Sequence, residues 1–222
     1  MDEKELKILL KKLPLTPGIL GKEEYFNSSV MIPLVKINGE YHFLFEKRAA
    51  KIRQGGEVCF PGGEIDRLID GDYKDTAIRE TCEELGINKL HIKVLGQLDT
   101  LIGPAGITVD SYLGILKIKN IDKLKFGRNE VEKVFSIPVS YFLKNEPEKY
   151  YVRLEIHSTG IDQNGKKIEM LPVKKLNLPA RYSNSWGSRK HKVLVYTKTE
   201  EIIWGITATL IYEVISKIKG LN

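Results

Sequence analysis

The sequence predicts an α+β fold in which a mixed β-sheet is sandwiched between helices. Apolar residues recur at helical spacing in residues 1–14, 74–85 and 201–218, and shorter apolar runs that suit strands are scattered between these segments. Strands scattered between helices favour layers of sheet and helix. The 222 residues, of which 42% are hydrophobic, suit one domain, with or without a sizeable insertion, and no repeat or low-complexity linker divides them.

The chain is expected to begin with an amphipathic helix followed by a β-hairpin. The first 14 residues open with acids and mix charged with apolar positions, which is atypical of a signal peptide, so we expect a helix that ends at Pro14. Strands are predicted at 29–37 and 41–45. Asn38-Gly39 between them is the strongest short-range signal for a hairpin turn.

The next helix is predicted over residues 74–85. Asp72 or Asp75 can cap its start, and Gly86 ends it. Three apolar residues at i, i+4 and i+7 form the stripe that we expect to face the core: Ile78, Cys82 and Leu85.

The second half of the chain continues the alternation of strands and turns. Strands are predicted at 91–99, 111–119, 132–138, 150–158 and 192–197. The first two flank the loop 101–110, and a helical turn starts at 140–143. We expect 150–158, a turn at Asn164-Gly165 and 168–171 to form a peripheral hairpin, and 172–191 to form an irregular basic loop. The helix over 201–218 closes the chain, and its expected buried residues include Ile206, Leu210, Tyr212 and Ile215.

Composition limits the classes of partner and compartment. No apolar run approaches the roughly 20 residues that span a bilayer. Cys59 and Cys82 are the two cysteines, which argues against a disulfide framework or a cysteine zinc site and favours a cytoplasmic protein. The net charge of +6 favours anionic partners such as phosphates, although it also permits weak nucleic-acid binding.

Three glutamates on the 74–85 helix point to metal chemistry. Glu80, Glu83 and Glu84 lie at i, i+3 and i+4, so their carboxylates share a helix face and repel one another. A hard divalent cation reverses that cost, because Mg²⁺ takes oxygen ligands and commonly uses carboxylates together with substrate phosphates. Ahead of the helix, Pro61-Gly62-Gly63 gives a tight turn at which backbone can approach a ligand closely. An ordinary solvated acidic face is the alternative.

Residues 63–87 resemble the Nudix box. The matching positions are Gly63, Arg79, Glu80, Glu83, Glu84, Gly86 and Ile87. This sequence has two extra residues between the glycine and the arginine, so Asp70 and Asp72 both qualify as the acid in the middle of the box. Thr81 stands where an aliphatic residue or alanine is usual. The resemblance implies an α/β/α sandwich with a mixed sheet, in which the box is a catalytic loop–helix–loop, and a Mg²⁺ cofactor, with Mn²⁺ as a possible substitute.

Residues 44–63 are similar to the segment that precedes the box in the coenzyme A diphosphatase branch of that family. The matching positions are Arg48, Ala49, Arg53, Gly56 and Phe60-Pro61-Gly62-Gly63, with Arg53 and Gly56 one residue closer than in the branch. Residues 95–101, 129–143 and 203–211 also resemble this branch. The resemblance implies a small nucleoside diphosphate substrate, coenzyme A or its thioesters, cleaved to 3′,5′-ADP and 4′-phosphopantetheine.

The resemblance also implies roles for individual residues. Glu80 and Glu84 are the expected main Mg²⁺ ligands, Glu83 is an additional or water-mediated ligand, and Arg79 orients Glu80. The general base is left open between Glu80, Glu130 and Glu132. Arg48 and Arg53 are expected to grip phosphate oxygens, because a guanidinium fork matches them, and Gly62 and Gly63 to lie against the substrate. Phe60 is expected to support the turn from the core.

Outside the box, a basic cluster surrounds Trp186. Its members are Arg181, Arg189, Lys190, His191 and Lys192. The cluster can hold the 3′-phosphate of coenzyme A, Trp186 can stack on a base, or the cluster can contact RNA. The alternative is a solvated basic loop. The competing functions are a Nudix hydrolase of ADP-ribose or a dinucleotide, and a catalytically silent module that binds nucleotide or RNA. We expect a monomer or a homodimer.

Overall fold

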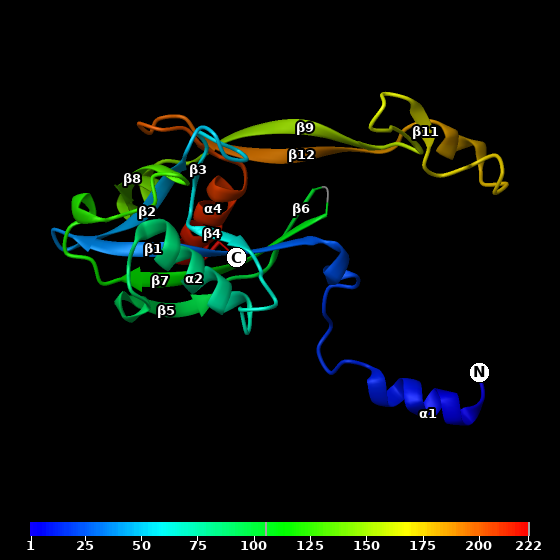
Figure 1. The fold of residues 1–222 in the computed structure, drawn as a ribbon, viewed down its shortest axis with the longest axis horizontal. Helices are drawn as coiled ribbons and strands as arrows, with labels where there is room; N and C mark the ends of the chain where they lie inside the picture. The colour runs from blue at the N-terminus through cyan, green and yellow to red at the C-terminus, as the bar shows by residue number, and fades with distance from the viewer. Residues whose placement is uncertain (105, 222) are drawn as a thin grey trace.

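A computed structural model describes residues 1–104 and 106–221; position 105, in the expected loop 101–110, and position 222 lie outside the described residues. The centre of the fold is an eight-stranded sheet with the order β3-β2-β1-β7-β5, in which β4 pairs with β1, β6 with β7 and β8 with β2 (Figure 1). The strands are β1 (Phe26–Ile37), β2 (Glu40–Arg48), β3 (Val58–Cys59), β4 (Gly62–Glu64), β5 (Ile92–Gln97), β6 (Leu101–Gly103), β7 (Ile107–Leu116) and β8 (Val131–Pro138). β1 and β7 run parallel and the other pairs antiparallel, so the sheet is mixed, as expected.

Helices cover both faces of this sheet. α2 (Tyr73–Leu85) lies on one face, and α3 (Val139–Lys144) with α4 (Gly205–Lys219) lies on the other (Figure 1). Successive residues of β1 show both contacts: Met31 packs in a cluster with Ala77 of α2, whereas Ile32 packs in a cluster with Ile211 of α4. This arrangement confirms the α/β/α sandwich.

The hairpin that opens the sheet forms as predicted. Asn38 and Gly39 both have positive φ, 49° and 89°, and Ile37 pairs directly with Glu40 across the turn. Such a two-residue turn matches the right-handed twist of the two strands. β1 and β2 are both longer than expected, because each gains ladder partners from a second neighbour.

α2 begins and ends where its sequence indicates. The Asp72 carboxylate accepts a hydrogen bond of 2.9 Å from the Asp75 N–H, so Asp72 is the cap, and Gly86 ends the helix with φ of 64°. The expected core stripe is only partly right. Ala77, Thr81 and Leu85 are fully buried, whereas Ile78 and Cys82 are half-buried.

Small side chains explain this rotation of the buried face. α2 packs against β1 and β4, and Ala77 and Thr81 allow the helix backbone to approach these strands more closely than Ile78 would. The Thr81 hydroxyl donates a 2.6 Å hydrogen bond to the Ala77 carbonyl, so it is buried without losing a partner. Glu84 is consequently turned inward and is only 5% exposed.

Several boundaries in the second half differ from expectation. The predicted strand at 91–99 is preceded by a 3₁₀ turn, η2 (Lys89–His91), and the helix predicted from residue 201 starts later because β13 (Ile203–Trp204) pairs with a neighbouring strand. On α4, Leu210 and Ile215 are buried, Tyr212 is half-buried, and the expectation for Ile206 was wrong because it is 38% exposed.

The pairing expected for the peripheral hairpin was also wrong. β9 (Glu148–Ile156) pairs with β12 (Trp186–Tyr196), and the predicted turn at Asn164-Gly165 joins a small hairpin at the tip, β10 (Thr159–Ile161) with β11 (Lys167–Glu169). β12 offers a longer complementary ladder than residues 168–171 do. Only the last part of the expected basic loop, 186–191, is therefore strand, and η4 (Ala180–Ser183) precedes it. The ribbon of β9 and β12 extends away from the body (Figure 1).

The N-terminal helix stands apart from the sheet. α1 (Glu3–Lys12) has a capping box made by Asp2 and Glu5 but buries none of its residues (Figure 1). Between α1 and β1, beside the turn η1 (Lys22–Glu24), the Lys22 ammonium lies 2.6 Å from the buried Asp110 carboxylate and ties this segment to β7. A turn, η3 (Ile121–Lys123), precedes β8. Across residues 1–104 and 106–221, no helix is long and apolar enough to cross a membrane.

Candidate active site

The turn before α2 is held tightly against the sheet. Phe60 is 3% exposed and stacks on Phe45 with ring centroids 5.0 Å apart, which confirms its expected core position. The Pro61 carbonyl accepts a 2.9 Å hydrogen bond from the Met31 N–H. A Cβ on Gly62 would lie 2.4 Å from the Ser29 carbonyl oxygen of β1, so this position admits no larger residue without movement of backbone.

Arg79 organises the acids of the box. Its Nε and one terminal nitrogen each bond Asp70 at 2.9 Å, and its other terminal nitrogen donates to Glu80 at 2.7 Å and to Glu83 at 3.2 Å. The Arg79 hydrogen bonds hold the pKa of Asp70 down at about 2. Of the two candidates for the acid in the middle of the box, Asp70 is therefore the one that pairs with Arg79, and Asp72 caps the helix.

Glu84 lies at the base of the site. One of its carboxylate oxygens accepts a 2.9 Å hydrogen bond from the Gly62 N–H. Burial raises the pKa of Glu84, the negative charge of Glu46 raises it further, and the Gly62 N–H offsets part of that rise. Burial also raises the pKa of Glu80, against the lowering effect of Arg79. Both carboxyls are thus poised to gain from a nearby positive charge.

Glu46 is a member of this cluster that the sequence analysis missed. It lies on β2, is 1% exposed, and accepts a 3.3 Å hydrogen bond from the Cys59 thiol on its Oε1. Within the described residues its Oε2 has no hydrogen-bond partner. Burial raises the pKa of Glu46. The sequence carried one signal for this burial. Successive side chains of a strand alternate between its faces, so Glu46 shares a strand face with Leu44.

The structure places Arg48 and Glu130 near these acids. The positive charge of Arg48 acts on Glu46 and Glu84, and the negative charge of Glu130 acts on Glu46 and Glu80. The Glu130 carbonyl also accepts a 2.8 Å hydrogen bond from the Ala49 N–H, next to Arg48. Two residues selected on opposite sides of the box in sequence therefore border the same cluster.

Other residues selected from the sequence have different partners. The Arg53 guanidinium lies over the Phe26 ring, 5.4 Å from its centroid, and its carbonyl accepts a 3.1 Å hydrogen bond from Arg48. Glu132 pairs with Lys47 at 3.3 Å. The basic residues around Trp186 lie on η4 and β12, outside the acidic cluster, where Trp186 packs edge-on against Tyr182.

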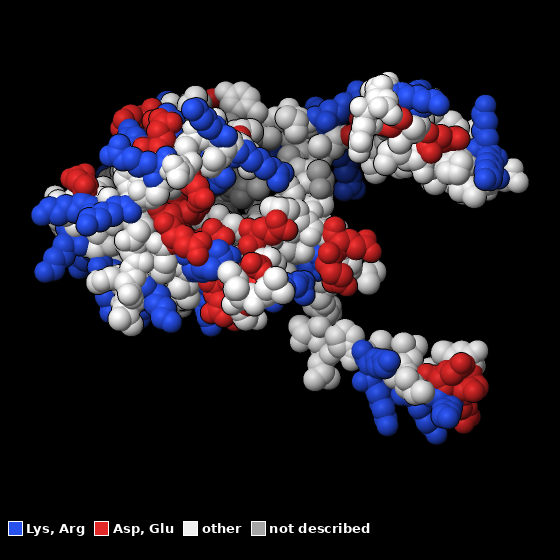
Figure 2. All heavy atoms as spheres, in the orientation of Figure 1, with Lys and Arg blue, Asp and Glu red and all other residues white. Residues whose placement is uncertain are grey.

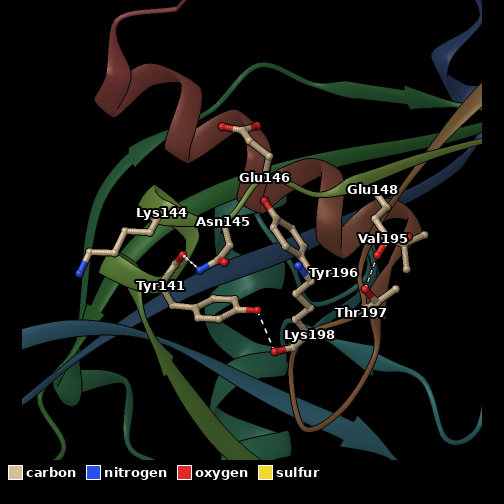
Figure 3. Close-up of a pocket in the computed structure, with 9 residues that line it drawn as sticks. All are labelled: Tyr141, Lys144, Asn145, Glu146, Glu148, Val195, Tyr196, Thr197 and Lys198. Carbon is tan, nitrogen blue, oxygen red and sulfur yellow. Dashed lines mark hydrogen bonds between the residues drawn. The ribbon is translucent and has the colours of Figure 1, made fainter.

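Two hollows lie outside the acidic cluster. A groove of about 540 Å³ opens beside β4, lined by Glu23, Tyr25, Asn27, Glu64, Ile65, Asp66 and Arg67. A smaller cavity of about 190 Å³ lies between α3 and the end of β12, with Tyr141, Asn145, Glu146 and Tyr196 among its lining residues (Figure 3). There, the Tyr141 hydroxyl donates to the Lys198 carbonyl at 2.9 Å.

The donor set suits a hard divalent cation. Figure 2 shows acidic side chains gathered on the face that carries α2, with basic side chains beside them. Glu46, Glu80, Glu83 and Glu84 offer only carboxylate oxygens, which Mg²⁺ prefers. In the part of the chain that the structure describes, no three Asp, Glu, His or Cys side chains are already gathered as a metal cage. Arg79 and the Gly62 N–H hold three of these glutamates instead, and among the described residues the Glu46 Oε2 has no hydrogen-bond partner, so it is a free oxygen donor.

Comparisons with known proteins show what the whole chain resembles. Residues 26–154 match the model of the NUDIX domain family. Nudix hydrolase 3 of Caenorhabditis elegans is 28% identical over 192 residues, which cover 85% of this chain and 71% of that protein.

Two further relatives are named for coenzyme A. The peroxisomal coenzyme A diphosphatase NUDT7 of Mus musculus is 34% identical over 135 residues, covering 60% of this chain and 55% of that protein. The mitochondrial coenzyme A diphosphatase NUDT8 of Homo sapiens is 32% identical over 126 residues, covering 56% and 53%. The match thus spans little more than half of either protein. Among solved structures, a MutT/nudix family protein from Enterococcus faecalis has a TM-score of 0.49 at 14% identity, covering 99% of this chain and 70% of that one.

Proposed function

Because the chain belongs to the Nudix family, whose hydrolases cleave diphosphates and generally use divalent metal ions, we propose that it is a Mg²⁺-dependent pyrophosphatase of coenzyme A or its thioesters. Water adds to one phosphorus of the diphosphate, and the bond from that phosphorus to the bridging oxygen breaks. The products are 3′,5′-ADP and 4′-phosphopantetheine, which carries the acyl group when the substrate is a thioester.

The observation that carries the proposal is the arrangement around Arg79. One guanidinium holds Asp70, Glu80 and Glu83, while Glu84 lies on the Gly62 N–H. This keeps several carboxylates together although they repel one another. A solvated acidic face would not require a nearly buried Glu84.

Each residue of the cluster has a proposed task. Glu80 and Glu84 hold the metal and Glu83 supplements them, while Arg79 fixes the direction of Glu80. When bound, Mg²⁺, or Mn²⁺ in its place, would supply positive charge to the diphosphate and would lower the pKa of a bound water.

The remaining tasks fall to residues at the border of the cluster. Glu130 is the proposed acceptor for the proton of the attacking water, and Glu80 is the competing base. Arg48 binds a phosphate oxygen, and its charge already acts on Glu46 and Glu84. Arg53, which lies against Phe26, supports the phosphate side of the site, and the Gly62-Gly63 backbone lets the substrate approach.

The preference for coenzyme A is supported by the two diphosphatase relatives at 32–34% identity, together with the similarity of residues 44–63 to that branch. Incubation with Mg²⁺ and coenzyme A, followed by separation of the products, tests it. We expect equal amounts of 3′,5′-ADP and 4′-phosphopantetheine. Turnover of ADP-ribose or a dinucleotide without turnover of coenzyme A would assign another diphosphate substrate. Inactivity on the whole panel together with salt-dependent RNA binding would support the binding function instead.

A further inference from the structure

The buried carboxylate of Glu46 has half of its hydrogen-bonding capacity unused. Glu46 lies inside the sheet, with Cys59 opposite it on β3 and Val134 opposite it on β8, so its backbone is fixed on both sides. Its side chain is 1% exposed, and among the described residues only its Oε1 has a partner, the Cys59 thiol.

This position is costly without a cation. A buried polar atom that gives up water normally gains a hydrogen bond in exchange, and a buried carboxylate needs a partner of opposite charge. Glu46 instead shares its surroundings with the negative charges of Glu80, Glu84 and Glu130. Arg48 contributes an attractive charge, but its guanidinium Nε donates its 3.1 Å hydrogen bond to the Arg53 carbonyl.

Glu46 belongs to a different element from the glutamates of the box. Glu80, Glu83 and Glu84 come from the helix, whereas Glu46 comes from the sheet beneath it. Mg²⁺ favours near-octahedral coordination, which ligands from a single helix face cannot surround. A carboxylate from the sheet supplies a donor from a second direction.

We propose that Glu46 is a further carboxylate of the divalent-metal centre, with its Oε2 as the donor atom. This inference rests on the proposed metal-dependent function and adds a ligand outside the box. The metal would neutralise the repulsion between Glu46 and Glu84.

The test measures Mn²⁺ binding to the full chain. Electron paramagnetic resonance of the free ion gives the amount bound. Glu46→Gln keeps the size of the side chain and the acceptor for the Cys59 thiol. We expect it to weaken Mn²⁺ binding by about tenfold or more. Its melting temperature without metal shows whether the variant folds. Glu40→Gln, at the exposed start of β2, is the matched control and should behave as wild type in both measurements.

Crystals soaked in Mn²⁺ give a second measurement that does not depend on a variant. Anomalous density in direct contact with Glu46 Oε2 is expected. Wild-type Mn²⁺ affinity in Glu46→Gln, or density that contacts only residues of α2, would overturn the role of Glu46 while leaving the proposed function intact. If the wild-type chain takes up no Mn²⁺ at all, both the role of Glu46 and the proposed function fail.

Discussion

Arg79 and Asp70 are joined by two hydrogen bonds of 2.9 Å, which clamp the loop of the box onto its helix. Asp70 is also bonded by the Thr76 hydroxyl at 2.9 Å and by the Asp66 N–H at 3.0 Å. Its carboxylate is 2% exposed. The clamp fixes Arg79 in the position from which it bonds Glu80 and Glu83.

Asp70→Asn is expected to destabilise the protein and reduce turnover. The amide cannot accept both Arg79 hydrogen bonds, and a lost hydrogen bond between charged groups costs about 1.5–3 kcal/mol. Urea unfolding measures the loss. Asp72→Asn is the matched control, since asparagine caps a helix as well as aspartate does, and its stability should be close to wild type. Equal destabilisation by the two variants would contradict the clamp.

The same clamp predicts a particular acid dependence. The pKa of Asp70 is about 2 in the folded chain, below its ordinary value of 3.8, so the unfolded chain takes up the proton first as pH falls. The stability that Asp70 contributes is complete above about pH 4 and is lost as pH falls to about 2. The difference in unfolding free energy between wild type and Asp70→Asn should therefore shrink across this window. A constant difference would show that Asp70 is not held as a carboxylate.

Gly62 and Gly63 should respond differently to alanine. A Cβ on Gly62 meets backbone of β1, whereas a Cβ on Gly63 would lie 2.5 Å from the movable Glu80 Oε1. Gly62→Ala is expected to lose about 1–3 kcal/mol of stability in urea unfolding. Gly63→Ala should remain folded but lose turnover by up to about 100-fold, because Glu80 is displaced. Full activity of Gly63→Ala would argue against a role for Glu80.

Arg48 should matter more than Arg53 for substrate binding. The charge of Arg48 acts on the buried acids, whereas Arg53 lies over Phe26. Arg48→Ala is expected to raise the KM for coenzyme A about tenfold or more, since hydrogen bonds to charged groups contribute about 1.5–3 kcal/mol. Arg53→Ala is the comparison and should raise it less. The reverse order, measured by steady-state kinetics, would exchange the proposed roles.

The sequence predicted those features that depend on neighbouring residues. The C-terminal end of α2 follows from Gly86, and its start lies at Asp72, one of two candidate caps. The first hairpin follows from Asn38-Gly39, and the acidic face follows from the spacing of Glu80 and Glu84. These signals depend on residues that are close to one another in the sequence.

Features that depend on distant pairing were not predicted. The pairing of β9 with β12 is decided by a ladder between segments about 30 residues apart, which composition does not reveal. Glu46 was missed because its burial results from β3 and β8 flanking β2, together with the helices that cover both faces of the sheet. The sequence also left Asp70 and Asp72 as equal candidates for the acid in the middle of the box. Only the direction of the Arg79 side chain shows that Asp70 is its partner.

The most direct test of the central claim compares wild type with Glu84→Gln in the Mg²⁺-dependent hydrolysis of coenzyme A. Glutamine keeps an oxygen for the Gly62 N–H, so the variant should fold normally while its turnover falls by more than about 100-fold. Wild-type cleavage into 3′,5′-ADP and 4′-phosphopantetheine, with almost none from the variant, is the expected result. Equal cleavage by both proteins would contradict metal-dependent catalysis by the acids of α2.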